Sequence, residues 1–350
     1  MDNDEILDIY DATTAPHVVS FWNTNQELTE PYLGDGVLFA STRLTDDQVN
    51  IVTGSDTVPQ LLDQTSRDAK AIPLTRGTLE TSSKEVPGFK NSMIINEKDI
   101  RDYRRAQASA DKGLADVVLN RIYADQTRLL QNAAYRREAM AMEELTTGKL
   151  TLDSKKVVDF GLKTWQKAKA TADWGADGSN PYDDIYALQT AAAQKTGTTL
   201  GRAVMNQKTF NKLVRNNTLK STLLANNANT AVAFVPNSVV TGFLFSELGL
   251  TIQVYNKGYS DSTGFHTFIP DDVVSFLPTE GQVGRMAYAA TPEEEESSRL
   301  EGTVAIAGSG VAVHVYDQSD PVARTTKVDQ WVMPVLDVAN QIAILNVSGK

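Results

Sequence analysis

The sequence predicts a mixed α+β protein with a strand-rich C-terminal half. Three observations predict this class. A proline-free stretch from about residue 99 to residue 147 repeats apolar residues at helical spacing, strand and helix patterns alternate after it, and β-branched apolar runs fill the last third. No internal repeat or low-complexity tract is present, so a repeat architecture is not expected.

Length and composition indicate an ordinary soluble protein. A chain of 350 residues can bury a substantial core in one or two domains. Cysteine is absent, which excludes disulfides, thiolate metal sites and cysteine nucleophiles and suits a reducing cytoplasm. No apolar run approaches the roughly 20 residues that span a bilayer, and the acidic first five residues do not resemble a secretory signal. We therefore expect no membrane partner.

Charge is distributed unevenly along the chain. The net charge is −11, which argues against a dedicated nucleic-acid-binding domain. Residues 101–137, however, hold eight basic and four acidic side chains. Three interpretations stay open for these basic residues: regular nucleic-acid recognition, which lacks a motif, non-specific attraction to phosphate, and salt bridges within or between subunits.

The first hundred residues predict little packed structure. Residues 1–44 mix short apolar groups with turn formers, which indicates an extended arm. Residues 48–53 predict a strand, and the polar, proline-containing stretch from there to about residue 88 predicts a long projecting loop or hairpin. Such a loop usually serves function or contacts a partner.

Residues 99–147 predict one long helix, or a short helix followed by a long one, with Gly113 as the interruption. A single helix over residues 114–147 would be about 50 Å long at 1.5 Å per residue. Gly148 is placed to end it. The apolar face is expected to comprise Leu114, Val118, Ile122, Leu129 and Ala133.

Shorter elements follow Gly148. A hairpin is predicted at residues 149–152 and 157–160, and helices are predicted from about residue 183 and at residues 208–215. Strands are predicted at residues 203–205, 251–255, 273–277, 303–306 and 311–316, before a final apolar segment at residues 331–347.

No residue is a convincing catalytic, cofactor-binding or metal-binding candidate. His17, His266 and His314 have no partner at metal-ligand spacing. Asp183 and Asp184 could bind a hard cation, but their place at a helix start favours capping. The acidic run at residues 293–296 predicts a solvated loop or helix start.

The sequence also contains none of the active-site motifs that its glycine-rich and acidic segments suggest. Residues 197–202 lack the spacing and the Lys-Ser/Thr pair of a phosphate loop, and Gly308-Ser309-Gly310 leads toward a strand. Residues 261–264 differ from an aspartic-protease signature by one extra residue, and no Gly-x-Ser-x-Gly elbow occurs. We therefore expect no enzyme and no cofactor.

A series of short segments from Tyr135 to the C-terminus occurs in a characteristic order. They are Tyr135-Arg136-Arg137 through Glu143-Glu144-Leu145, then Gly148-Lys149-Leu150-Thr151, Trp174 through Tyr182-Asp183-Asp184-Ile185, Met205-Asn206 with Phe210, Ile269-Pro270-Asp271-Asp272 with Val274 and Leu277, Gly284-Arg285 with Tyr288, and Asp329-Gln330-Trp331-Val332-Met333 with Pro334-Val335-Leu336. Together they resemble the phage major capsid protein E family, whose best-known member comes from phage lambda. Before residue 98 the resemblance is only architectural.

The resemblance implies the Hong Kong 97-type capsid fold. Residues 1–44 would form the N-terminal arm, 45–98 the extended loop, 99–164 the peripheral domain with its spine helix, and 165–350 the axial domain with strands returning to the peripheral domain. It also implies a major capsid protein that self-assembles through pentamers and hexamers into the icosahedral head of a tailed bacteriophage around double-stranded DNA.

The resemblance further implies partners and contact residues. The partners would be a portal protein, a separate scaffolding protein, a decoration protein and packaged DNA held by non-specific contact, in a virion capsid assembled in the bacterial host cytoplasm. The spine helix of this fold lies near the inner surface. Contacts to DNA or scaffold are therefore expected from Arg101, Arg104, Arg105, Arg121 and Arg128. Lys84 and Lys90 lie in the general region of a loop lysine that could form a maturation cross-link.

Two alternatives stay open. An encapsulin-like compartment would share the fold but enclose cargo protein. A metal-dependent hydrolase or transferase that uses Asp183 and Asp184 would belong to another class.

Overall fold

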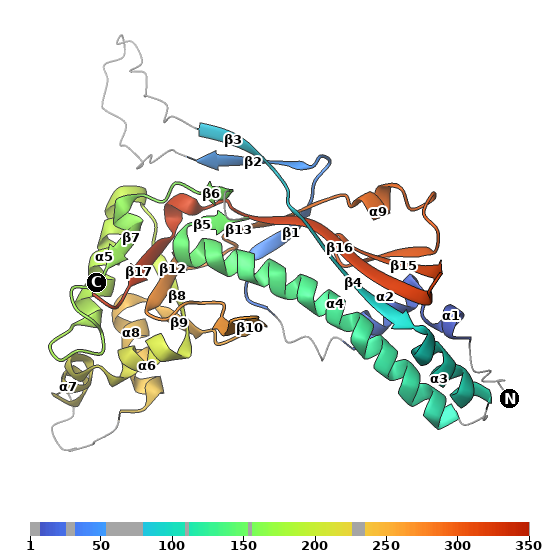
Figure 1. The fold of residues 1–350 in the computed structure, drawn as a ribbon. Helices are drawn as coiled ribbons and strands as arrows, with labels where there is room; N and C mark the ends of the chain where they lie inside the picture. The colour runs from blue at the N-terminus through green and yellow to red at the C-terminus, as the bar shows by residue number, and fades with distance from the viewer. Residues whose placement is uncertain are drawn as a thin grey trace, which may run out of the picture. The chain divides into compact units, whose positions relative to one another are not determined.

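The computed structural model describes residues 8–25, 32–53, 80–108, 112–152, 156–225 and 235–349 (Figure 1). The chain divides into two compact units. Unit 1 comprises Met1–Val49, Ser83–Glu138 and Met286–Pro334, and unit 2 comprises Asn50–Ser82, Ala139–Arg285 and Val335–Lys350. Each unit is therefore built from segments that lie far apart in the sequence.

A six-stranded sheet, ordered β1-β13-β16-β15-β14 with β4 also paired to β16, lies mainly in unit 1. Its longest strand is β16, Val322–Leu336. Residues 322–330 of β16 pair antiparallel with β15, and residues 323–331 pair antiparallel with β4 on the other edge. The remaining strands are β1 (Phe39–Arg43), β4 (Gly88–Asn96), β13 (Gly284–Ala289), β14 (Thr303–Ala307) and β15 (Val311–Ser319).

The N-terminal segment is helical where it is described, so the expectation of an extended arm is wrong for residues 9–24. Helix α1 spans Ile9–Ala12 and α2 spans Ala15–Thr24. Apolar residues at 15, 18, 19 and 22 follow the spacing of one helical face, and Val18 is buried in a core with Leu130 and Val313. The turn formers downstream had obscured this short periodicity.

The two-helix interpretation of residues 99–147 is confirmed. Helix α3 spans Glu97–Ala108 and α4 spans Lys112–Thr147. Gly113 lies inside α4, and the junction at residues 109–111 lies outside the described residues. With 36 residues, α4 is roughly 54 Å long. Its apolar face differs from the expected one at the start, where Leu114 is 49% exposed and Ala115 is buried.

Gly148 ends α4 as expected. Its φ is +70°, and its N–H donates to the carbonyl of Glu144 at 2.8 Å. A side chain would be strained at this φ, and a Cβ there would lie 2.8 Å from Leu162. The chain can therefore leave the helix sharply only because this residue is glycine.

Residues 48–53 form the predicted strand. Strand β2 (Gln48–Thr53) pairs with β3 (Glu80–Glu85) in a two-stranded sheet, which confirms the hairpin, while residues 54–79 lie outside the described residues. Residues 88–96 were not expected to form a strand. They do so as β4 because β16 supplies the pairing partner.

Unit 2 contains a five-stranded sheet ordered β7-β17-β12-β8-β9. Trp174 and Phe276 are fully buried in its core. The strands are β7 (Lys167–Lys169), β8 (Leu200–Met205), β9 (Thr251–Val254), β12 (Val273–Pro278) and β17 (Ala343–Asn346), and the helices are α5 (Pro181–Thr196), α6 (Gln207–Arg215), α7 (Asn217–Ala225) and α8 (Asn237–Leu248). The predicted strands and helices of this region are confirmed, with ends shifted by a few residues.

Short elements complete the two units. The predicted hairpin after Gly148 is confirmed as β5 (Lys149–Thr151) with β6 (Val157–Asp159). A second hairpin, β10 (Gly258–Asp261) with β11 (Gly264–Thr267), was not expected. Helix α9 (Pro292–Glu295) and the 3-10 turns η2 (Thr164–Gln166) and η3 (Ala339–Gln341) are short as well.

Candidate functional site

Two charged residues of α4 hold residues 34 and 35 in unit 1. The buried carboxylate of Glu138 accepts the backbone N–H groups of Gly34 and Asp35, each at 3.0 Å. Arg137 Nε donates to Asp35 Oδ2 at 2.6 Å, and its Nη1 donates to Gln330 Oε1 at 2.8 Å. Burial opposes the charge of Arg137, but Asp35 holds the pKa of Arg137 above its usual value. We call these two residues of α4 and their bonds to Gly34 and Asp35 the clasp. A buried charge is tolerated only when it has such partners. The bonds of the clasp therefore fix residues 34 and 35 in place.

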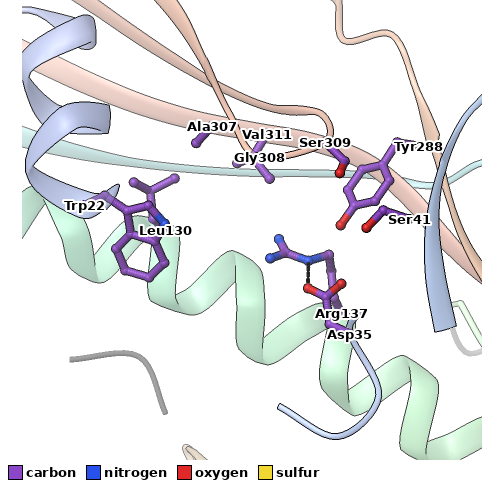
Figure 2. A pocket seen from close by; sticks show the side chains of 10 residues that line it. All are labelled: Trp22, Asp35, Ser41, Leu130, Arg137, Tyr288, Ala307, Gly308, Ser309 and Val311. Carbon is purple, nitrogen blue, oxygen red and sulfur yellow. Dashed lines mark hydrogen bonds and ion pairs between the residues drawn. The ribbon is translucent and has the colours of Figure 1, made fainter. Parts of the chain in front are cut away.

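A cavity of about 160 Å³ lies beside the clasp (Figure 2). The guanidinium of Arg137 lies between a wall formed by Trp22 and Leu130 and a wall formed by Ser41 and Tyr288. Burial raises the pKa of Tyr288 to about 12. Ligand pockets usually measure about 300–1,000 Å³, so this cavity suits a small polar group rather than a cofactor or a nucleotide.

A second ionic cluster joins β4, β16 and α9 in unit 1. Lys90 Nζ lies 3.1 Å from Asp329 Oδ2 and 3.4 Å from Glu293 Oε1, and Lys327 forms an ion pair with Glu293. The side chains of Asp329 and Glu293 are only 1% and 7% exposed. Two carboxyl groups and two ammonium groups therefore lie together where the sheet meets α9.

The two carboxyl groups of this cluster differ in acidity. Burial, followed by the neighbouring Glu293, raises the pKa of Asp329 to about 7. Burial opposes ionisation of Glu293 too, but Asp329 and Lys327 as hydrogen-bond partners lower the pKa of Glu293 to about 2. The cluster thus holds one firmly ionised carboxylate and one that takes up a proton near neutral pH.

Glu144 is a fully buried acid near the end of α4, in unit 2. Neither carboxylate oxygen has a hydrogen-bond partner among the described residues. Burial, reinforced by Glu143 and Asp337, raises the pKa of Glu144 well above its usual value. We conclude that this group is held in its neutral form, which avoids the cost of an unpaired buried charge.

The five arginines that the resemblance selects are all exposed, on α3 (Arg101, Arg104, Arg105) and on α4 (Arg121, Arg128). Two of them form exposed ion pairs along their own helices, which at most contribute about 0.5 kcal/mol each. These are Arg105 with Asp102 at 3.9 Å and Arg128 with Asp125 at 3.8 Å. Contact of these arginines with DNA or scaffold stays a prediction.

Arg136 and Arg137, the other two arginines of this region, contact residues outside α4. Arg137 belongs to the buried clasp. Arg136 is exposed, and its guanidinium lies 4.6 Å from the centre of the Phe89 ring. The salt-bridge interpretation therefore holds for the buried Arg137 and, through weak exposed pairs, for Arg105 and Arg128.

Asp183 and Asp184 lie in the first turn of α5, which begins two residues earlier than expected with Pro181. Asp184 accepts the N–H and hydroxyl of Thr171 and, at 3.0 Å, the indole N–H of Trp174. Its role is therefore to anchor the loop that carries the buried Trp174, rather than to cap its own helix. Carboxylate–helix dipole attraction still favours both residues at this position.

The other residues considered from sequence lie apart. His17 contacts Thr14, His266 contacts Asp261 and Thr263, and His314 contacts the carbonyl of Glu301. In the parts of the chain that the structure describes, no group of three or more metal-ligating side chains occurs. No described helix is both long and apolar enough to cross a membrane.

The acidic run at residues 293–296 begins a helix, as expected. Glu293 departs from the expectation of a solvated run, because it is buried against Lys327 in the ionic cluster. Local sequence could not reveal this, since the partners of Glu293 lie on β4 and β16. Lys90, considered from sequence as a loop lysine, is a member of the same cluster.

The fold defines the class of protein. A solved structure described as a capsid protein of an Escherichia coli CFT073 prophage is 14% identical, with a TM-score of 0.60 over 95% of this chain and 99% of that chain. A phage-related protein from Bordetella bronchiseptica RB50 is 12% identical, with a TM-score of 0.56 over 96% and 97%. The capsid of cyanophage A-1(L) is 9% identical, with a TM-score of 0.53 over 99% and 97%. The protein therefore has the Hong Kong 97-type phage capsid fold.

The sequence decides the family. The model of the phage major capsid protein E family matches residues 21–347, so the chain belongs to that family. No curated protein matches the sequence significantly. The protein is thus a structural subunit of a phage head, and copies of it assemble into the shell. The encapsulin-like alternative has no comparable support.

Proposed function

We propose that this capsid protein assembles through pentamers and hexamers into an icosahedral head that retains double-stranded DNA. The observation that carries the proposal is the family match over residues 21–347. In this proposal residues 1–44 act as the N-terminal arm, 45–98 as the extended loop, 99–164 as the peripheral domain and 165–350 as the axial domain. Unit 1 supports one part of it, because it gathers most of α3 and α4 with strands from the C-terminal third.

Microscopy and size measurement test this assembly directly. Purified protein should form closed shells whose capsomers have five-fold and six-fold symmetry in electron micrographs. A small oligomer under all assembly conditions would contradict the proposal. Nucleic acid inside shells purified from infected cells would separate a phage head from a compartment filled with cargo protein.

The exposed arginines of α3 and α4 are proposed to face the packaged DNA or a scaffold. Exposed arginines such as Arg101, Arg104 and Arg105 on α3 and Arg121 and Arg128 on α4 attract phosphate without reading sequence. The net charge of −11 limits such attraction elsewhere. Contacts of this kind weaken as salt is raised.

Charge reversal tests this surface. Arg101→Glu, Arg104→Glu and Arg105→Glu together should lower DNA retention or scaffold-dependent assembly several-fold. Arg299→Glu is a matched control for Arg105→Glu. Both side chains are highly exposed, at 80% and 74%, and each pairs with an acid three residues earlier. Unchanged assembly and DNA retention in the triple variant would remove the proposal.

Further partners complete the proposed assembly pathway in the host cytoplasm. They are a portal protein at one vertex, a separate scaffolding protein and a decoration protein. Co-expression of the capsid protein with each neighbouring structural gene product, followed by particle purification, would identify them. Shells that form with the correct size from the capsid protein alone would show that a separate scaffold is not required.

A further inference from the structure

The β10–β11 hairpin of unit 2 is a separate two-stranded sheet. Its strands pair with each other from Gly258↔Thr267 to Asp261↔Gly264, and with no other described strand. A lone hairpin is only marginally stable in water. At the turn, Asp261 Oδ1 accepts the N–H of Thr263 at 2.7 Å and its hydroxyl at 2.6 Å. The turn is therefore held in shape by its own side chains.

Aromatic rings connect the core of unit 2 to one face of this hairpin. Buried Tyr255 stacks on Phe268, which is followed by Tyr259, with ring centroids 6.2 and 5.7 Å apart. Phe265 lies on the other face of the hairpin, because it pairs with Ser260 while Tyr259 pairs with His266, and it is 66% exposed. Its ring lies over Gly258, where a Cβ would come within 2.7 Å of it. The large exposed ring is thus oriented in advance, which lowers the entropy cost of docking.

A second apolar surface lies on α5 and α8. We call it the α5–α8 face and define it as Tyr182, Tyr186, Val239 and Phe243. Tyr182 has its ring centroid 6.4 Å from Tyr186 and 6.0 Å from Phe243, while Tyr186 is 56% and Val239 46% exposed. Gln189 of α5 donates to the carbonyl of Leu248 of α8 at 3.0 Å. This bond ties the two helices that present the face.

The hairpin and α5 lie on opposite sides of unit 2 (Figure 1). The hairpin of a chain therefore does not cover its own α5–α8 face. Two different surfaces of one subunit that fit each other make a head-to-tail contact, which generates a closed ring when the rotation between copies closes. A shell subunit is surrounded by further copies of itself, so a second copy is the occupant that both surfaces have within reach.

The exposed apolar area of the two surfaces is small. Fully buried aromatic side chains each contribute about 150–250 Å², so the exposed parts of Phe265, Tyr186 and Val239 offer roughly 300 Å² together. A specific stable interface buries about 1,600 Å² in total. The contact is too small to hold an isolated dimer, but each copy in a ring makes it twice.

We infer that the β10–β11 hairpin of one subunit docks, through Phe265, on the α5–α8 face of the next subunit in the ring. The inference rests on the proposed assembly through pentamers and hexamers. It identifies the two surfaces that meet in each ring. Around the ring, the hairpin of each subunit contacts the α5–α8 face of the next subunit.

The absence of cysteine makes a disulfide test clean, because introduced thiols are the only ones present. Ser260 is exposed and lies opposite Phe265 across the hairpin, so a thiol at this position leaves the docking ring in place. Ser260→Cys and Val239→Cys subunits, mixed, assembled and oxidised, should give a covalent heterodimer on a non-reducing gel. Ser260→Cys with Phe245→Cys is the matched control, because Phe245 is 62% exposed on the same helix α8 but lies about 120° around that helix from Val239. Equal cross-linking in the control, or none in the test pair, overturns the inference.

Assembly of single variants gives a second readout. Phe265→Ser should keep the fold, as measured by circular dichroism and thermal unfolding, and should raise the concentration needed for assembly at least tenfold. Phe245→Ser should assemble like the parent protein. If the parent protein forms shells with five-fold and six-fold rings and Phe265→Ser assembles equally well, the docking inference is wrong. The proposed function is not affected by that result. Parent protein that forms no such rings would instead contradict the proposed function.

Discussion

Lys90 of β4 lies directly opposite Asp329 of β16, with its Nζ 3.1 Å from a carboxylate that is almost completely buried. Because the folded-state pKa of Asp329 is about 7, above its ordinary value of 3.8, this group stabilises the fold fully below about pH 4. That contribution is lost as pH rises to about 7. The Asp329→Asn variant has no group that ionises at this position, so it should not lose this stability. As pH rises from about 4 to about 7, the unfolding free energy of the variant should increase by about 1–3 kcal/mol relative to that of the parent protein. Urea unfolding of the unassembled subunit measures it.

Glu293 should show the opposite dependence. Its pKa of about 2 lies below the ordinary value, so its contribution is present above about pH 4.5 and is lost as pH falls through 2. Glu293→Gln should therefore lower the unfolding free energy at neutral pH, where Asp329→Asn raises it. Parallel pH profiles for the two variants would contradict the description of the cluster.

The clasp between Arg137 and Asp35 should behave as one energetic unit. Their side chains are 12% and 16% exposed, and removal of one partner from a buried pair costs about 3–5 kcal/mol. Arg137→Met and Asp35→Asn should each be strongly destabilising, and the double variant should cost clearly less than their sum. Additive effects in this double-mutant cycle, measured by chemical denaturation, would show that the pair is not coupled.

Asp184 should matter for stability and not for a metal ion. Asp184→Ala leaves the indole N–H of the buried Trp174 and the backbone N–H of Thr171 without their acceptor, which should cost about 1–3 kcal/mol. A chelator should leave the melting temperature of the parent protein unchanged. A shift caused by the chelator and abolished in Asp184→Ala would revive the metal-dependent alternative.

Glu144 should tolerate loss of its ionisable group. Because the pKa is raised, the contribution of Glu144 to stability is lost as pH rises, and Glu144→Gln should keep or increase stability in alkaline solution. Glu143→Gln is the neighbouring control. The carboxylate of Glu143 accepts the N–H of Thr151 at 3.0 Å, so its removal should weaken the fold instead. Thermal unfolding at neutral and alkaline pH compares the two.

Elements whose apolar residues repeat at a regular spacing, or whose ends are marked by turn residues, were predictable from the sequence. The proline-free helices α3 and α4, the glycine that ends α4, and the hairpin β5–β6 all follow from residues close together in the chain. Strand β4 was missed because it is largely exposed and therefore lacks the alternation of a half-buried strand. Helix α2 was missed because it spans only 10 residues, among turn formers.

The buried charges were beyond local patterns for a different reason. Arg137 and Asp35 are 102 positions apart, and Glu293 meets Lys90 across 203 positions. Only the tertiary fold decides which of several similar charged side chains become buried. Nothing in the acidic run at residues 293–296 distinguishes Glu293 from its exposed neighbour Glu295. The sequence reveals the excess of charge but not its pairing.

Strand β16 has a mechanical consequence for a shell subunit that is placed under tension. It pairs over nine residues with β15 on one edge and over nine residues with β4 on the other. A pull along β16 would load these two ladders in shear, so their hydrogen bonds would have to fail together instead of one after another. The sheet is therefore expected to resist tension best along this strand.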